Sequence, residues 1–210
     1  EILDYAEKLV FDISQDDRRR TAGFTAIQGL LAGAIDRIEE LYESGSALTG
    51  ISTGFSDLDD LTSGLQRSDL IVIAGRPSMG KTSLAMNIVE SAVLDSKLPA
   101  AVFSMEMPGQ QLAMRMLSSL GRINAHRVRT GKMTGEDWPR LTSAVGLLNE
   151  VPLFIDDTAA LTPLELRSRA RRLVREHSEL GLIVVDYLQL MQSSESSENR
   201  AIEVANITRS

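Results

Sequence analysis

The chain has 210 residues, 43% hydrophobic and 24% charged, which is enough for one substantial core and too little for three. Its 29 acidic and 22 basic residues give a net charge of -7, which excludes nucleic-acid binding through bulk positive charge and leaves only local basic patches for such contacts. The absence of cysteine excludes disulfides, cysteine-based zinc sites and a thiol nucleophile. The sequence contains no run of 18 apolar residues, so it predicts no membrane-spanning helix.

Two amphipathic segments come first. Over residues 1–14 the apolar residues recur at helical spacing, which predicts a short helix with one apolar face that needs a partner. A polar break at 16–20 is interpreted as a solvated hinge. A second helical pattern runs from about Thr25 to Tyr42. Residues 46–68 are rich in Gly, Ser, Thr and Asp and predict a loop with one short helix around Leu58 to Leu61.

Beyond residue 68, short apolar runs alternate with amphipathic stretches. The apolar runs predict strands covered on both faces, at Leu70–Ala74, Ala100–Phe103, Leu153–Ile155 and Leu182–Val185. The amphipathic stretches predict helices, at Lys81–Leu94, Gly109–Leu120, Trp138–Asn149 and Pro163–His177. This order predicts an α/β fold with a parallel sheet. A last helical pattern, Ala201–Ile207, has no cap, and the chain starts at Glu1 without a signal peptide, so we expect a fragment of a longer protein.

The first predicted strand leads into the sequence GRPSMGKT, which matches G-x-x-x-x-G-K-[ST] at the strand-to-helix junction that this motif requires. Its glycines let backbone N–H groups surround a phosphate chain, and the next helix adds the positive end of its dipole. We expect Lys81 to reach the β and γ phosphates of ATP and the Thr82 hydroxyl to bind Mg²⁺. The alternative is a Gly-rich turn before an ordinary helix. The candidate nucleotide-binding residues are Gly75, Arg76, Pro77, Ser78, Met79, Gly80, Lys81, Thr82 and Ser83.

Acidic residues follow three of the predicted strands. Asp186 ends the last apolar run and is the natural second anchor for the metal, with a helix or turn cap as the alternative. Hydrolysis also needs a group that orients the attacking water, and Glu106 lies just beyond the run Ala100–Phe103. A charge at a helix N-terminus is the other interpretation of Glu106. Asp156 and Asp157 compete for the same role but rank lower, because a turn-like segment follows them.

A set of short motifs connects these positions along the chain. They are Thr53-Gly54-Phe55, Leu58-Asp59, Ser63-Gly64-Leu65-Gln66, Ser68-Asp69-Leu70, Ala74 to Thr82, Phe103 to Pro108, Arg129-Thr130-Gly131 and Asp186 to Met191. Together they resemble the ATPase domain of the bacterial replicative DNA helicase family, the DnaB family, densely from about residue 48 to 210. The resemblance implies a RecA-like P-loop NTPase core over 21–210, incomplete at the C-terminus, after a linker helix and hinge over 1–20.

The resemblance also implies an activity and partners. It makes the chain an ATP hydrolase and helicase, with Glu106 and Lys81 as catalytic residues and Thr82 and Asp186 as ligands of Mg²⁺. It implies a hexameric ring, assembled through the helix Ile2–Ile13, that hydrolyses ATP at subunit interfaces, moves 5′ to 3′ on single-stranded DNA and unwinds duplex. Primase and a helicase loader are implied partners, and the bacterial cytoplasm is the implied location. The family's sensor glutamine, DNA-contacting loops, arginine finger and collar domain fall outside this sequence, so we expect the fragment alone not to unwind DNA.

Two other functions remain open. One is a strand-exchange recombinase or another RecA-type ATPase, which the Arg-Pro-Ser-Met filling of the motif disfavours. The other is a non-catalytic interaction module that docks through Ile2–Ile13. Five arginines from Arg167 to Arg175, against Glu165 and Glu176, give one predicted helix a local charge of +3. This helix is interpreted as a solvated face or a subunit contact, with a DNA-facing patch as the less favoured alternative. His126 and His177 are interpreted as surface residues. With 4% aromatic residues, no single-strand stacking platform is expected.

Overall fold

The computed structural model describes residues 26–44, 48–192, 204–205 and 207–208. The chain divides into two compact units, residues 1–46 and 47–210. The predicted boundary between residues 20 and 21 and the predicted helix over 1–14 both lie outside the described residues, so they stay predictions. Of the predicted C-terminal helix, 204–205 and 207–208 are helical and the rest lies outside the described residues. Within the described part of the chain, no helix combines the length and apolar character needed to cross a bilayer.

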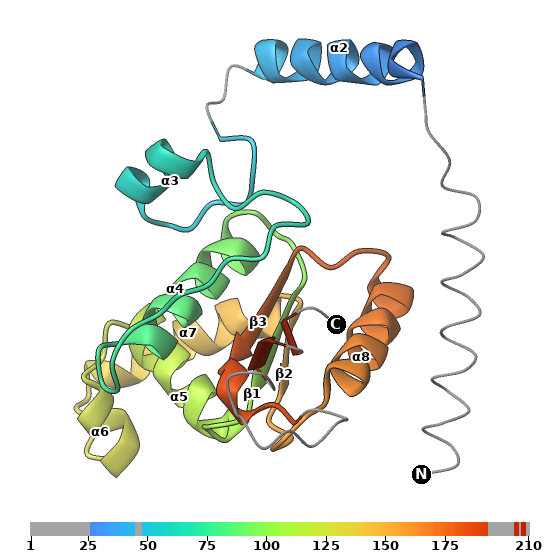
Figure 1. Ribbon diagram of the computed structural model, residues 1–210. Coiled ribbons are helices and arrows are strands. Elements are labelled where there is room, and N and C mark those ends of the chain that lie inside the picture. The colour runs from blue at the N-terminus through green and yellow to red at the C-terminus, as the bar shows by residue number, and fades with distance from the viewer. Residues whose placement is uncertain (1–25, 45–47, 193–203, 206, 209–210) are drawn as a thin grey trace. The chain divides into compact units, whose positions relative to one another are not determined.

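In the first unit, helix α2 spans Ile27–Ser44, close to the predicted Thr25–Tyr42 (Figure 1). Six of its large apolar side chains recur at helical spacing, and each of these six is half exposed or more. These side chains are Ile27, Leu30, Leu31, Ile35, Ile38 and Tyr42. The helix therefore has an exposed apolar stripe of the kind that amphipathic helices bury against a partner.

The second unit is built on a three-stranded parallel sheet with strand order β2-β1-β3 (Figure 1). The strands are β1 (Ala100–Ser104), β2 (Leu153–Asp156) and β3 (Leu182–Asp186), so three of the four predicted strands are confirmed. The central strand β1 is buried along its whole length, as its continuous apolar sequence predicts. In the register, Ser104 at the end of β1 pairs with Asp186 at the end of β3.

Four predicted helices of the second unit form as expected. They are α4 (Lys81–Leu94), α5 (Gly109–Leu120), α7 (Asp137–Asn149) and α8 (Pro163–His177). The start of α8 is fixed by a capping box between Thr162 and Glu165. The short helix α3 (Ser56–Thr62) is also confirmed. Two short elements were not predicted, α6 (Ala125–Thr130) and the 3₁₀ turn η1 (Leu188–Leu190), because neither is long enough for an apolar period.

The hydrophobic core lies on both faces of the sheet. Because side chains alternate along a strand, Ala100 and Val102 of β1 face one way and Ala101 and Phe103 the other. The first pair packs with buried residues of α4 and α5: Met86, Val89, Val93, Leu112 and Met116. The second pair packs with Leu161 and with half-buried residues of α8, Leu166 and Leu173. Figure 1 shows α8 on one side of the sheet and α4 and α5 on the other.

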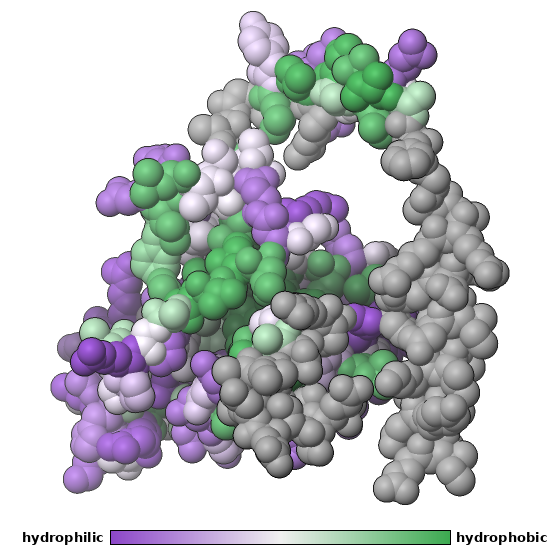
Figure 2. Space-filling view, in the orientation of Figure 1, coloured by the Kyte–Doolittle hydropathy of each residue, from purple (hydrophilic) through white to green (hydrophobic). Residues whose placement is uncertain are grey.

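The predicted strand Leu70–Ala74 is wrong for this structure. The segment has no regular secondary structure, and Leu70 and Val72 are 74% and 71% exposed. A strand covered on both faces needs a neighbour that pairs its backbone and layers that bury its side chains. Among the described residues β3 pairs only with β1, and neither requirement is met for residues 70–74. These residues instead contribute to the exposed hydrophobic surface of the unit, part of which Figure 2 shows.

Candidate nucleotide-binding site

The loop of residues 75–80 leads directly into α4 and is exposed. Ser78 and Gly80 have φ angles of 64° and 87°, in the left-handed region, and the amide of Met79 donates to the carbonyl of Arg76 over 3.3 Å. At Gly80 the space around a Cβ would be open, so it is the positive φ that favours glycine there. The loop thus turns the chain tightly into the amino-terminal end of α4, where unpaired amides favour an anion.

Lys81, the first residue of α4, folds back over this loop. Its ammonium donates to the carbonyl of Arg76 over 3.2 Å. Its side-chain carbons pass so close to Gly75 that a Cβ there would lie 3.4 Å from Lys81 Cγ. The arrangement brings the positive charge into the turn through contacts with the turn's own backbone. A phosphate oxygen, which is charged, forms a stronger hydrogen bond with an ammonium than a neutral carbonyl does.

Thr82 and Asp186 meet although they are 104 residues apart in the sequence. Thr82 Oγ1, in the first turn of α4, donates to Asp186 Oδ2 at the end of β3 over 2.8 Å. Asp186 is buried at 8% exposure. A hydroxyl and a carboxylate are oxygen ligands of the kind that suits Mg²⁺. Within the described ranges no group of three or more His, Asp or Glu side chains could hold a metal, so an ion here would need phosphate or water oxygens as further ligands.

Glu106 lies two residues beyond β1, next to the strand end that carries Asp186. The amide of Met105 donates to the carbonyl of Asp186 over 2.9 Å, which extends the pairing of β1 and β3. The buried hydroxyl of Ser104 donates to the carbonyl of Met107 over 2.7 Å and closes a turn around Glu106. This turn exposes the Glu106 side chain, which forms no hydrogen bond or ion pair with any residue that the structure describes.

Asp156 and Asp157, the two competing carboxylates, are both engaged in structural contacts. Asp156 accepts hydrogen bonds from Arg169 and from the amide of Thr158. Partial burial by itself raises the pKa of Asp156, but the hydrogen bonds from Arg169 and Thr158 and the charge of Arg169 outweigh it and hold that pKa below its ordinary value. Asp157 accepts from the amide of Gly109 over 2.8 Å at the start of α5. A carboxylate that is fixed in this way is a poor proton acceptor.

A residue without a predicted role organises the segment before the loop. Asp59 of α3 accepts from Ser52 Oγ over 2.7 Å and from the amide and hydroxyl of Thr53 over 2.9 Å and 2.7 Å. Burial is the largest single influence on the pKa of Asp59 and raises it, but these hydrogen bonds together outweigh burial and lower that pKa. Gly54, at a φ of 79°, packs against Ser91 of α4, where a Cβ would lie 3.1 Å from the Ser91 Cβ. The spacing of Thr53, Gly54 and Asp59 was visible in the sequence, but its structural purpose was not.

The arginines of α8 are partly engaged within the chain. Arg169 pairs with Asp156, and Arg172 lies 4.0 Å from Glu176 on the same helix. His126 and His177 are exposed, as predicted, and the ring of His177 packs on Phe154 with centroids 4.6 Å apart.

Comparison with known proteins places the chain in a family. The family model described as the DnaB-like helicase C terminal domain matches residues 50–210. Two relatives named replicative DNA helicase DnaB are similar over the entire chain. The one from Buchnera aphidicola subsp. Acyrthosiphon pisum is 50% identical over 211 residues, and the one from Geobacillus stearothermophilus 47% over 210. In both cases the chain spans 46% of the relative's length.

Two solved structures have the same fold. One, described as an ATPase domain, superposes with a TM-score of 0.82 at 27% identity, over 89% of this chain and 66% of that one. A structure described as a DnaB-like replicative helicase and its interactions with primase gives a TM-score of 0.76 at 24% identity, over 99% and 52% of the two chains. The parallel sheet and the P-loop position agree with the RecA-like α/β fold class. The chain belongs to the DnaB-like helicase C-terminal domain family.

Proposed function

We propose that this chain is the motor domain of an ATP-dependent replicative DNA helicase. In the complete protein it hydrolyses ATP at the subunit boundaries of a hexameric ring, moves 5′ to 3′ on single-stranded DNA and unwinds duplex. The observation that carries this proposal is the hydrogen bond between Thr82 and Asp186, which joins the P-loop to the end of β3 in a member of this family. The chain spans 46% of its curated relatives, so the isolated fragment is not proposed to unwind DNA.

The P-loop and Lys81 bind the phosphates in this proposal. Loop amides and the first turn of α4 surround the phosphate chain, and the Lys81 ammonium exchanges the carbonyl of Arg76 for phosphate oxygens. Thr82 Oγ1 and the Asp186 carboxylate would hold Mg²⁺, and the ion would supply positive charge next to the phosphates. Catalysis is then largely positioning and electrostatic stabilisation.

Glu106 orients the attacking water. Three observations support this assignment over Asp156 and Asp157. Glu106 follows the strand paired with the one that carries Asp186, it has no partner among the described residues, and the Ser104 turn exposes it. Asp156 and Asp157 are engaged by Arg169 and by the amide of Gly109.

Self-assembly and the other partners follow from family membership. We propose a homo-hexamer in the bacterial cytoplasm that works with primase and a helicase loader. Of the related proteins, one solved helicase is described with its interactions with primase. The helix Ile2–Ile13, predicted to mediate assembly, lies outside the described residues. The exposed apolar stripe of α2 supports self-association of this part of the chain.

The test is ATP binding by the 210-residue chain, measured by isothermal titration calorimetry with a slowly hydrolysed ATP analogue and Mg²⁺. Lys81→Ala should abolish binding, because the charge inside the loop is lost. Lys97→Ala is the matched control, since Lys97 is an exposed lysine in the loop after α4, and it should bind normally. Asp186→Asn should weaken binding only when Mg²⁺ is present. Undetectable binding by the unmodified chain would favour a non-catalytic interaction module.

A further inference from the structure

The methionines of this chain differ sharply in their exposure to solvent. The sequence has eight, and the structure describes all of them. Met86, Met116 and Met191 are buried at 4% exposure or less. Four others are half-buried: Met105, Met107, Met114 and Met133. Met79 alone among the eight is exposed, at 74%, and it lies in the P-loop.

The backbone holds Met79 next to the groups that favour an anion. Its neighbours Ser78 and Gly80 have φ angles of 64° and 87°, and its amide donates to the carbonyl of Arg76 over 3.3 Å. Gly80 is the N-cap of α4, and the first amides of a helix have no acceptor within the helix. The Met79 side chain therefore begins beside donors that are available for phosphate oxygens.

The side chains of Met79 and Lys81 start at the same place in the loop. A Cβ at Gly75 would lie 3.8 Å from Met79 Cβ and 3.4 Å from Lys81 Cγ. The Lys81 ammonium donates to the neutral carbonyl of Arg76, a weaker acceptor than a charged oxygen. Because both side chains are long and unbranched, a strong acceptor at the end of Met79 can reach the Lys81 ammonium.

An exposed thioether reacts with peroxides. Its sulfur attacks one oxygen of hydrogen peroxide, so that an S–O bond forms while the O–O bond breaks. The transferred oxygen gives its proton to the departing hydroxide, which leaves as water. The sulfur is oxidised by two electrons and the peroxide is reduced. The product, methionine sulfoxide, is polar, and its oxygen accepts hydrogen bonds. Since susceptibility follows exposure, Met79 should react before the other seven methionines.

We propose that Met79 is a peroxide-sensitive modification site, whose conversion to the sulfoxide lowers the affinity of the P-loop for ATP. The sulfoxide oxygen accepts from the Lys81 ammonium and from the free amides at the start of α4, where it competes with phosphate oxygens. It also brings partial negative charge to a place that binds a polyanion. The inference rests on the proposed function, because it concerns the nucleotide of that site.

The first experiment measures which methionine reacts. The full-length protein, free of nucleotide, is treated with dilute hydrogen peroxide, and the sulfoxide at each methionine is followed over time by peptide mass spectrometry. We expect Met79 to react at least about tenfold faster than Met86 and Met116, and about threefold faster than the half-buried methionines. In urea the rates should become equal. Similar rates at Met79 and Met86 in the native protein would overturn the proposal.

The second experiment measures the consequence for the nucleotide. A slowly hydrolysed ATP analogue is titrated calorimetrically before and after treatment that oxidises Met79 but not the buried methionines. We expect the Kd to rise at least about tenfold, because a hydrogen bond to a charged group is lost to the phosphate. Methionine sulfoxide reductases for both sulfoxide epimers, with dithiothreitol as reductant, should restore the original Kd. A loss that these enzymes do not reverse would contradict the proposal.

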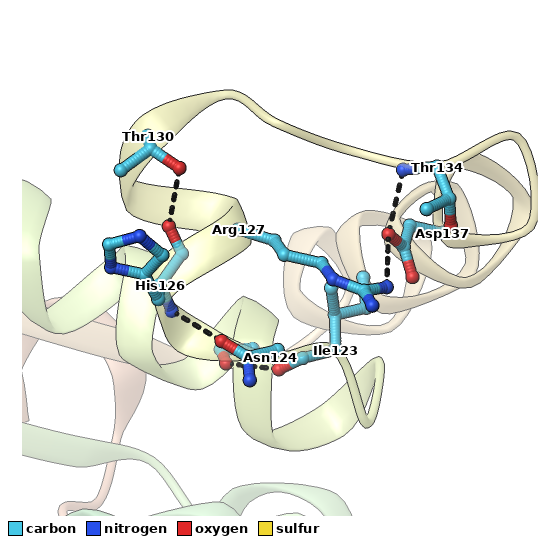
Figure 3. A network of polar contacts seen from close by, with 8 residues as sticks. Ile123, Asn124, His126, Arg127, Thr130, Thr134 and Asp137 are labelled. Carbon is cyan, nitrogen blue, oxygen red and sulfur yellow. Dashed lines mark hydrogen bonds and ion pairs between the residues drawn. The ribbon is translucent and has the colours of Figure 1, made fainter.

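Two variants assign the effect to one sulfur. Met79→Leu removes the thioether, so peroxide should change its Kd less than about twofold from whatever value it has before treatment. Met133→Leu is the matched control, in the loop between α6 and α7, where the amide of Thr134 donates to Asp137 over 2.8 Å (Figure 3). It keeps Met79 and should lose affinity as the unmodified protein does. Equal losses in the two variants would overturn the proposal.

The untreated protein separates this inference from the proposed function. If it does not bind the analogue before any peroxide is added, the proposed function fails, and this inference fails with it. If it binds the analogue and the Kd is unchanged once Met79 is oxidised, this inference alone is refuted.

Discussion

Two apolar runs of this chain differ in whether they form a buried strand. Ala100–Phe103 forms the centre of the sheet, with every residue at 2% exposure or less, whereas Leu70–Ile73 forms no strand and is 41–74% exposed. Each run leads into part of the candidate site, since the P-loop follows the second and the Glu106 turn follows the first. An apolar run thus indicates that a segment suits burial, while the neighbouring strands and helices decide whether it is buried.

The largest expected effect comes from replacing one valine by aspartate in each of the two runs. Val102→Asp, in β1, buries an uncompensated charge between two strands, so we expect a loss of more than about 4 kcal/mol or no folding. Val72→Asp, at a 71% exposed position, is the matched change and should alter the unfolding free energy by less than about 0.5 kcal/mol. Urea denaturation followed by circular dichroism measures both. Similar losses would mean that residues 70–73 are buried in solution.

The next effect concerns the turn that follows β1. Glu106→Gln in the full-length protein should bind ATP normally but hydrolyse it about 10²–10⁴-fold more slowly, because the group that orients water is lost. Asp157→Asn is the control, since its carboxylate accepts from the amide of Gly109 at the start of α5. We expect hydrolysis within about threefold of normal for that variant. Steady-state phosphate release measures both, and normal turnover by Glu106→Gln would return the role to Asp156 or Asp157.

A smaller effect should arise from the end of β1 itself. Ser104→Ala removes the hydrogen bonds between the buried Ser104 hydroxyl and Met107, which shape the turn around Glu106. We expect kcat to fall roughly tenfold with KM nearly unchanged, because the nucleotide-binding loop is not altered. Ser104→Thr keeps a hydroxyl and should recover part of the rate. A rise in KM without loss of kcat would contradict a positioning role.

The smallest effect tests the neighbouring strand β2. The pKa of Asp156 is lowered in the folded chain, so its ionised form stabilises the protein at pH values above its ordinary pKa of 3.8. That contribution is lost as the pH falls below 3.8 through the lowered folded value. Arg169→Met should therefore cost about 0.5–1 kcal/mol at pH 7 and progressively less in acid. Denaturation across about pH 2.5–7 measures the difference, and a cost independent of pH would show that packing, rather than charge, is lost.

Local patterns in the sequence accounted for much of the fold. The periodicity of α4, α5, α7 and α8 predicted their bounds within a residue, because apolar residues recur at helical spacing along each of them. The P-loop was recognised from glycine and lysine spacing, since its backbone geometry is local. The helix α6 was missed because six residues are too few for a periodic pattern.

Tertiary structure decided what depends on residues far apart in the chain. Thr82 and Asp186 each had a plausible role alone, but only the packing of α4 near the end of β3 brings their oxygens to 2.8 Å. The pairing of Asp156 with Arg169 and of Asp157 with Gly109 likewise could not be derived from spacing. The sequence by itself determined the helices and the tight turn of residues 75–80, because these rest on contacts between close neighbours. Whether an apolar run became a buried strand was decided by the strands that pair with it, as the different outcomes of Ala100–Phe103 and residues 70–73 show. Long-range contacts decided which carboxylates are engaged in hydrogen bonds and which are not, since the hydrogen bonds of a side chain depend on the residues that the fold places beside it.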